Sequence, residues 1–259
     1  MNNLAADLWH ARQNGELVDT TDFPGDPGDA YALQADVDRV SGAEICGFKI
    51  GATATATMDM LGVDEPFYGP LYRQYCRNNG DAVPVFALHG PKVETEFVIG
   101  IEQPLSANGS RTADDIKAVT GYVAGGFEII GNRFKTTPDK RGYCAIADFG
   151  ANVDFILGDK ITDWQDLNLD AHPVTLFAND EEITSGHSGM SIAGNPFGMV
   201  AWLINQPGFD ERGLKPGDLI TCGTCSGIHA VAAGDVLRAE FGELGTLGAT
   251  ITDASGHSN

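Results

Sequence analysis

Positive charge is scarce in this chain. Its 259 residues include 16 Lys and Arg against 36 Asp and Glu, which gives a formal net charge of −20. An acidic surface repels the phosphates of nucleic acids and the head groups of anionic membranes, so the composition argues against both as partners. A small anionic substrate would have to be held by local positive charge against this overall field.

Long apolar runs and a secretory leader are also missing. No apolar stretch approaches the roughly 18 residues that a membrane span requires. The first residues, Met1 to Leu4, lack a basic region that leads into an apolar segment. We therefore expect a soluble cytoplasmic protein.

Motifs for nucleotides, zinc and serine catalysis do not occur. The sequence has no P-loop and no G-x-G-x-x-G that follows a strand and opens a helix. The six histidines lack zinc spacing, and there is no G-x-S-x-G. Cys222 and Cys225 form a C-x-x-C pattern without a second such pair, so we interpret them as structural. We expect all five cysteines to be reduced thiols.

Helical patterns mark the beginning of the chain. Residues 3–13 and 27–40 space their apolar side chains for two helices. Asp26 is suited to cap the second helix, with Pro27 at its first position. We expect residues 1–42 to form a helical N-terminal appendage.

The remainder, residues 43–259, is rich in short strands with Gly and Pro turns. Residues 174–184 predict a hairpin, and residues 114–124 predict a helix that leads into a strand around Glu128. These patterns indicate one main domain of the α+β class.

The most informative stretch runs from Lys92 to Gly100, KVETEFVIG. It alternates and contains β-branched residues, so it predicts a strand on which side chains two apart share a face. Glu94 and Glu96 therefore point the same way, and adjacent carboxylates repel unless water or a cation lies between them. A hard divalent cation prefers such oxygen ligands. The pattern alone leaves open a metal site or the solvated face of an edge strand.

Further charged residues lie in or beside apolar strands. Glu128 is the only acid in its predicted strand and needs a partner there. Lys49 lies within the apolar stretch from Ile45 to Gly51. It is either an edge residue whose ammonium reaches solvent or a functional ammonium. Arg133 follows Glu128 and supplies local positive charge.

Six short motifs, in order, resemble the fumarylacetoacetate hydrolase superfamily, in particular its branch of 2-keto-4-pentenoate hydratases and 4-oxalocrotonate decarboxylases. The resemblance covers the chain from about residue 30 to its end. The motifs are GFKIG (47–51), LGVDEP (61–66), VETEF (93–97), FEII (127–130), NPFGMVAWL (195–203) and GLKPGD followed by GTC (213–225).

The resemblance implies a fold, a cofactor and site residues. It implies a mixed β-sheet roll or barrel as the catalytic domain, in a cytoplasmic homo-oligomer that associates with an enzyme of the same pathway. It implies that Glu94, Glu96 and Glu128 bind one Mg²⁺ or Mn²⁺, which holds a small anionic 2-keto acid. Lys49 and Arg133 are the implied catalytic residues, with Lys49 near the substrate carboxylate or dienol oxygen.

The chain also departs from this branch. The acid that the branch carries shortly after its L-G-V-D-x-P motif is absent from residues 68–75, which include Arg73 and Gln74. The branch's D-N-x-S-like stretch is DFGAN here (148–152), and of the acid-Ser-Arg after E-I-I only Arg133 remains. The metal ligands are retained, whereas the groups around the substrate are altered.

We predict a divalent-metal-dependent lyase that hydrates a 2-hydroxy-dienoate or 2-keto acid in aromatic-compound catabolism. One alternative is a decarboxylase of the 4-oxalocrotonate type, and another is a C–C hydrolase of acylpyruvates on the same metal. Hydrolases of the family usually carry a His-Glu pair that activates water, and none occurs between Gly51 and Gly69. A non-catalytic partner subunit is the last alternative, which the intact set of three acids disfavours.

Overall fold

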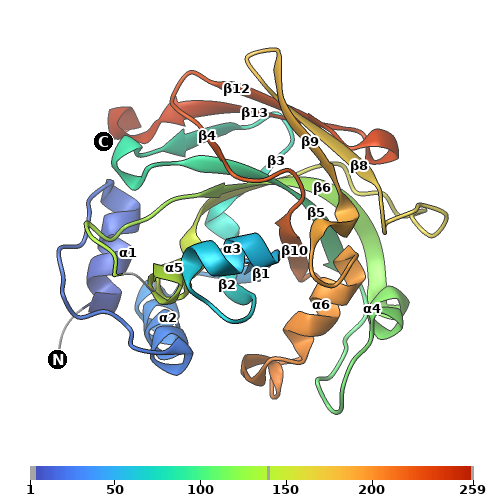
Figure 1. Ribbon diagram of the computed structural model, residues 1–259, viewed down its shortest axis with the longest axis horizontal. Coiled ribbons are helices and arrows are strands. Elements are labelled where there is room, and N and C mark those ends of the chain that lie inside the picture. The colour runs from blue at the N-terminus through green and yellow to red at the C-terminus, as the bar shows by residue number, and fades with distance from the viewer. Residues whose placement is uncertain (1–3, 139–140, 258–259) are drawn as a thin grey trace.

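Two β-sheets form the body of the protein. The computed structural model describes residues 4–138 and 141–257. The first sheet has eight strands in the order β2-β1-β10-β5-β6-β7-β3, with β11 paired to β5. The second has five strands in the order β4-β13-β12-β8-β9. Figure 1 shows the second sheet at the top, lying across the long curved strands β5 and β6.

The strands are short except for two. Those of the first sheet are β1 (Ile45–Gly51), β2 (Phe67–Tyr72), β3 (Cys76–Asn78), β5 (Lys92–Ile101), β6 (Thr120–Ile130), β7 (Asn152–Leu157), β10 (Leu219–Thr224) and β11 (His229–Ala230). Those of the second are β4 (Ala82–Val85), β8 (Pro173–Ala178), β9 (Glu181–His187), β12 (Val236–Glu240) and β13 (Thr246–Asp253). The predicted hairpin is the pair β8 and β9. The mixed sheets confirm the predicted α+β class.

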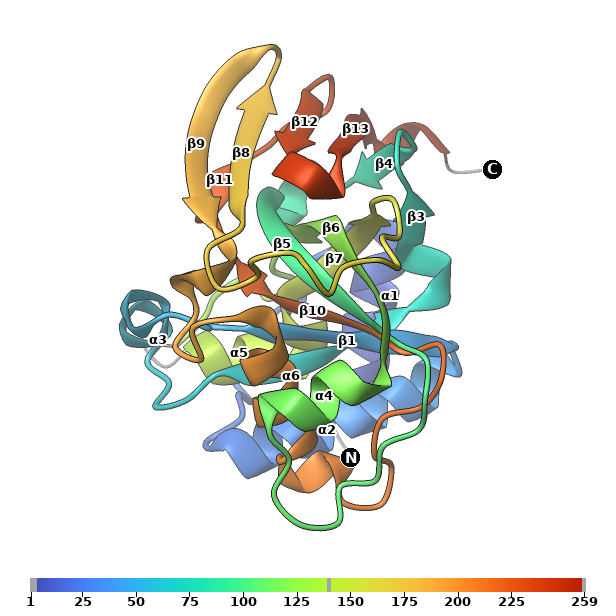
Figure 2. The same ribbon diagram turned by 90° about the vertical axis from the view of Figure 1, so that its right-hand side faces the viewer.

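Six α-helices surround the first sheet in the described part of the chain. They are α1 (Leu4–Asn14), α2 (Pro27–Ser41), α3 (Thr55–Leu61), α4 (Ala113–Val119), α5 (Arg141–Ala147) and α6 (Pro196–Ile204). In Figure 2, α4 and α6 cover one face of this sheet. Asp26 caps α2 as predicted, because its side chain accepts a hydrogen bond from the Asp29 amide. Among the described residues, no helix is long and apolar enough to cross a membrane.

The helix predicted over residues 114–124 begins near the right residue, but its predicted end lies too far along the chain. Helix α4 ends at Val119, and β6 begins at Thr120. Residues of the first part of β6 pair with β5, for example Val123 with Ile99 and Ala124 with Val98. The hydrogen bonds of this long antiparallel ladder outweigh the local helical pattern.

Strands β5 and β6 separate two buried regions. Phe97 and Phe127 lie on the face that packs against the second sheet. Val98 and Ala124, on the opposite face, pack with side chains of the other strands of the first sheet: Cys46, Leu71, Phe155 and Leu219. The first sheet therefore curls around its own interior, as the predicted roll requires. On β5 and β6, the side chains at even-numbered positions face this interior, and the three glutamates are among them.

The N-terminal region is helical as predicted, and it packs closely on the main body. Leu8 of α1 and Val37 of α2 share a buried cluster with Tyr72 and Phe149. Figure 1 shows α1 and α2 beside α5. The division of the chain at residue 42 stays a prediction.

Candidate functional site

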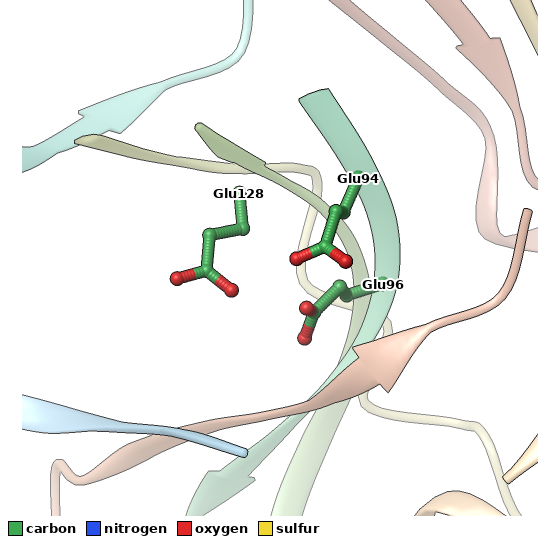
Figure 3. Close-up of side chains that lie close together, drawn as sticks. All are labelled: Glu94, Glu96 and Glu128. Carbon is green, nitrogen blue, oxygen red and sulfur yellow. The ribbon is translucent and has the colours of Figure 1, made fainter. Parts of the chain in front are cut away.

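Three glutamates converge inside the first sheet. Glu94 pairs directly with Glu128 across the β5–β6 ladder, and Glu96 lies two residues further on the same face. One carboxylate oxygen from each lies within 4.8 Å of the others. Figure 3 shows the three carboxylates turned toward one another. The exposed fractions of Glu94, Glu96 and Glu128 are 7%, 0% and 0%. The interpretation as a solvated edge strand is wrong, because β5 is a central strand between β10 and β6.

The buried carboxylates repel one another. Burial raises the pKa of Glu94 to about 7, a shift that Lys49 opposes and Glu128 reinforces. Burial and then the charges of Glu128 and Glu94 raise the pKa of Glu96 well above its ordinary value. Three carboxylates and the single Lys49 ammonium leave an excess of negative charge when all are ionised. A divalent cation between the carboxylates would balance this excess.

Two of the carboxylates each accept a hydrogen bond at only one oxygen. Glu96 Oε2 accepts a hydrogen bond from the Gly223 amide (2.9 Å), and Glu128 Oε1 accepts one from Asn152 Nδ2 (3.1 Å). The second oxygens of both carboxylates are buried: Glu96 Oε1 accepts no hydrogen bond, and Glu128 Oε2 has only the Lys49 ammonium, at 3.2 Å. A buried acceptor without a donor is costly unless a cation fills the space beside it. Oxygens held in this way fit a hard divalent ion such as Mg²⁺ or Mn²⁺.

Lys49 lies in β1 with its ammonium beside this cluster. Its Nζ donates to the Gly150 carbonyl (2.9 Å) and lies 3.2 Å from Glu128 Oε2. Burial lowers the pKa of Lys49, but the nearby Glu128, Glu94 and Glu96 outweigh burial and raise it overall. The ammonium therefore stays charged. Lys49 is not an edge residue that reaches solvent, because β1 lies between β2 and β10 and Lys49 is 2% exposed.

The Gly150 carbonyl is presented by an unusual turn. Phe149, Gly150 and Ala151 all have left-handed backbones, with φ of 57°, 66° and 65°. Two of these are not glycine, and such strain is concentrated at functional sites. The turn also requires Gly69 in β2, because a Cβ there would lie 2.5 Å from the Phe149 carbonyl oxygen. The altered stretch 148–152 thus supplies a main-chain carbonyl to Lys49 and an amide to Glu128.

Arg133 lies behind the wall of the site. Its side chain is fully buried, Nε donates to Asp148 Oδ1 (2.6 Å), and its amide donates to Asp148 Oδ2 (2.9 Å). Asp148 lines the adjoining cavity, whereas Arg133 does not. The structure therefore places Arg133 as the partner of Asp148. A catalytic role in contact with substrate finds no support in this position.

A cavity of about 420 Å³ leads to Lys49 and Glu94. Its wall combines polar side chains with a larger apolar part: Thr57, Met60, Leu61, Phe67, Leu88, His89, Lys92, Ile130, Asn132, Thr137, Arg141, Asp148 and Ile228. Arg73 and Gln74, the residues at the altered stretch, do not line it. Arg73 forms an ion pair with Glu44 that is largely exposed. Phe67, six residues earlier, lies there instead, with Lys49 Nζ 5.5 Å from its ring centre.

Several residues of the site could not be found from the sequence. His89 lines the cavity, and its Nε2 donates to the Glu16 carbonyl (3.0 Å). Burial, with Arg133 nearby, lowers the pKa of His89, so its ring is neutral near pH 7. Asn152 reaches Glu128 from the neighbouring strand. These contacts join residues that are distant along the chain, so no local pattern in the sequence indicates them.

The fold and the acidic cluster together define the class of protein. The model of the fumarylacetoacetate (FAA) hydrolase C-terminal family matches residues 76–252. The chain belongs to the fumarylacetoacetate hydrolase family, as predicted.

Curated relatives and solved structures are similar over nearly the whole chain. A 2-keto-4-pentenoate hydratase of Burkholderia vietnamiensis is 32% identical, covering 97% of each chain. A 4-oxalocrotonate decarboxylase of Pseudomonas putida is 30% identical, covering 89% of this chain and 88% of the relative. The structure of 4-oxalocrotonate decarboxylase from Pseudomonas putida G7 with magnesium and adipate has a TM-score of 0.86 at 27% identity, covering 96% of this chain and 95% of that one.

Proposed function

We propose that this protein is a divalent-metal-dependent lyase that acts on a 2-hydroxy-dienoate or 2-keto acid, as a hydratase of the 2-keto-4-pentenoate type in aromatic-compound catabolism. The observation that carries the proposal is the buried cluster of three glutamates beside a charged lysine at a cavity. Relatives named for this activity match the chain over nearly its full length.

Glu94, Glu96 and Glu128 would hold one Mg²⁺ or Mn²⁺. When bound, the ion supplies Lewis-acid stabilisation of negative charge on the oxygens of a 2-keto acid. The Gly223 amide and Asn152 each hold one oxygen of Glu96 and Glu128, so the other oxygen of each carboxylate is oriented before any ion arrives. The glutamates thus provide a rigid site with little to reorganise.

Lys49 is the residue that we propose to act on the substrate. Its ammonium is charged, buried and oriented by the Gly150 carbonyl, so it can hold a substrate oxygen and pass a proton to it. Phe67 and Ile130 present apolar surface to the carbon chain and exclude water from it. Arg133 supports this site indirectly, because it fixes the Asp148 carboxylate at the cavity wall.

The second candidate is decarboxylation of a dicarboxylic substrate of the 4-oxalocrotonate type. Two cationic side chains, Lys92 and Arg141, line the same cavity as Lys49. They offer positive charge to a second carboxylate, and the similar solved decarboxylase was crystallised with the dicarboxylate adipate. The C–C hydrolase alternative lacks such support, because residues 51–69 contain no histidine.

A spectrophotometric assay tests the proposal. 2-Hydroxypenta-2,4-dienoate is supplied with Mg²⁺ and then with EDTA, and CO₂ release from 4-oxalocrotonate is measured in parallel. We expect loss of dienol absorbance that EDTA abolishes. CO₂ release alone would favour the second candidate. Inactivity on both substrates, with metal still bound, would contradict the lyase assignment and direct the assay to acylpyruvates.

The cellular setting is part of the proposal. We propose a cytoplasmic homo-oligomer that associates with an enzyme of the same pathway, with residues 1–42 as a region distinct from the catalytic domain 43–259. Exposed apolar side chains on and after the edge strand β9, Ile183, Met190 and Ile192, support self-association. Light scattering after size exclusion tests this, since a monomer at micromolar concentration would contradict it.

A further inference from the structure

Arg12 carries a positive charge in the interior of the protein. It lies in α1, is 4% exposed, and has no carboxylate within ion-pair distance among the described residues. Its guanidinium carbon lies 4.1 Å from the ring centre of Tyr75 and 4.6 Å from that of Phe149. Burial, and then the charge of Arg133, lower its pKa to about 10. A buried charge of this kind needs strong hydrogen bonds to persist.

The guanidinium donates to the segment beside the acidic cluster. Nη1 donates to the Asn152 carbonyl (2.7 Å), and Nη2 donates to Asn152 Oδ1 (3.0 Å) and to the Val153 carbonyl (2.9 Å). Asn152 and Val153 lie 140 and 141 positions further along the chain. One side chain of α1 is therefore hydrogen-bonded to the first two residues of β7.

The hydrogen bond from Arg12 fixes the orientation of the Asn152 side-chain amide. A guanidinium has only donors, so the amide atom that faces Arg12 must be the oxygen. Nδ2 then faces Glu128 and donates to its Oε1 at 3.1 Å. This hydrogen bond holds the Glu128 carboxylate by Oε1 and leaves Oε2 for the cluster.

The same guanidinium supports the strained turn from behind. It packs on the Phe149 ring, while the Gly150 carbonyl at the front of the turn accepts from Lys49 Nζ at 2.9 Å. Backbone strain of this type persists only where the surroundings over-determine it. Arg12 is thus linked to both sides of the site, to Glu128 through Asn152 and to Lys49 through the turn.

We propose that Arg12 is a positioning residue of the metal centre, which acts through Asn152 on Glu128. The inference rests on the metal site of the proposed function. It makes the N-terminal helical region a structural part of that site, although its cavity and its acids come from other elements.

A double-mutant cycle on metal affinity tests the proposal. Mn²⁺ binding is measured by calorimetry, at one pH, for the wild type, Arg12→Met, Asn152→Leu and the double variant. We expect each single change to weaken Mn²⁺ binding by about tenfold, the range found for residues that orient metal ligands. Because both changes break one chain of contacts, the double variant should bind about as weakly as Asn152→Leu alone.

Arg212→Met is the matched control. Arg212 also stacks on an aromatic ring, that of Phe48 at 4.6 Å, and donates to Asp218 (2.7 Å), but it makes no contact with the turn. Its loss should lower thermal stability and leave Mn²⁺ affinity within about twofold. A merely structural Arg12 would behave in the same way.

The outcomes separate the two claims. Unchanged Mn²⁺ affinity in Arg12→Met, or losses that multiply in the double variant, would overturn the role of Arg12 while the metal site stands. A wild type that binds no Mn²⁺ would overturn both claims. If Arg12→Met does not fold, Arg12→Lys carries the test, because one ammonium cannot replace the planar fork. A several-fold loss of affinity is expected there, and wild-type affinity would refute the proposal.

Discussion

Glu94 differs from the other two acids because its carboxylate faces the cavity as well as the cluster. Replacing it by alanine removes one of three protein ligands. We expect Glu94→Ala to weaken Mn²⁺ binding by more than about 100-fold, beyond the effect of losing an orienting residue, and to lower turnover in parallel. Calorimetry and the dienol assay measure both. Glu102→Ala, at an exposed acid just after β5, is the control. Full activity with unchanged metal content in Glu94→Ala would refute the assignment.

A substitution of Lys49 should affect the reaction without weakening metal binding. Lys49→Met keeps the length of the side chain and removes the ammonium that lies 3.2 Å from Glu128. We expect Mn²⁺ affinity to be kept or increased, because a positive charge leaves the site, and turnover to fall about 10²–10⁴-fold, as for a lost acid–base group. Lys117→Met, at an exposed lysine of α4, is the control. Wild-type turnover in Lys49→Met would show that the ammonium is not used.

The raised pKa of Glu94 predicts how metal binding depends on pH. Burial raises this pKa from 4.5 to about 7, so below pH 7 the folded, metal-free chain holds a proton that the ion must displace. Mn²⁺ affinity should fall by at least about tenfold per unit as the pH drops below 7, because the raised pKa of Glu96 adds to this dependence. The proton also stabilises the metal-free fold below about pH 4.5, and this gain is lost as the pH rises through 7. Calorimetry in buffers of different ionisation enthalpy counts the released protons, and a flat profile would contradict the account.

At the residue scale, the sequence predicted only what has a local signal. Glu94 and Glu96 were found because strand geometry puts them on one face, and Glu128 because an acid in an apolar strand needs a partner. Asn152, Arg12 and Phe67 were not found. Their roles depend on contacts between residues distant along the chain, such as the bond from Arg12 to Asn152. No spacing rule describes such contacts.

At the scale of single elements, the strained turn 149–151 packs closely against β2 at Gly69. A methyl group at Gly69 would meet the Phe149 carbonyl oxygen at 2.5 Å, and main chain cannot move as a flexible side chain can. We expect Gly69→Ala to lower the free energy of unfolding by about 1–3 kcal/mol, as in overpacked cores, and to reduce turnover by shifting the carbonyl that holds Lys49. Chemical denaturation and the dienol assay measure these effects.

Gly25→Ala is the control for this change, because the nearest atom to a Cβ there lies at 3.6 Å. It should change the free energy of unfolding by less than about 0.5 kcal/mol. Equal stability of Gly69→Ala and Gly25→Ala would show that the turn adapts without strain.

Elements with strong end signals were predicted well. Asp26 with Pro27 marks a helix start, and the Asp26 side chain caps α2 as expected. Asn195 with Pro196 begins α6 in the same way. The boundary between α4 and β6 was misplaced, because pairing with β5 decides it and residues 120–124 carry no local stop signal. The left-handed turn at Phe149 was also beyond prediction, since non-glycine residues rarely adopt that backbone.

For the whole molecule, the family resemblance predicted the curled mixed sheet, whereas composition and spacing alone reached only the α+β class. The curl of the first sheet depends on pairs such as β1 with β10, which join strands far apart in the sequence. This curl buries the three glutamates and makes them a site rather than a solvated face. The N-terminal helices support the site through Arg12, although the sequence indicated an appendage.

The central claim is that this curled sheet binds one divalent ion through Glu94, Glu96 and Glu128. Titration of the chelator-treated protein with Mn²⁺, followed by the electron paramagnetic resonance signal of free Mn²⁺, tests it most directly. The account predicts that the free signal stays suppressed until one equivalent per chain is added, and that Glu128→Gln abolishes this suppression. A free signal that rises from the first addition in the wild type, or identical titrations of wild type and Glu128→Gln, would contradict it.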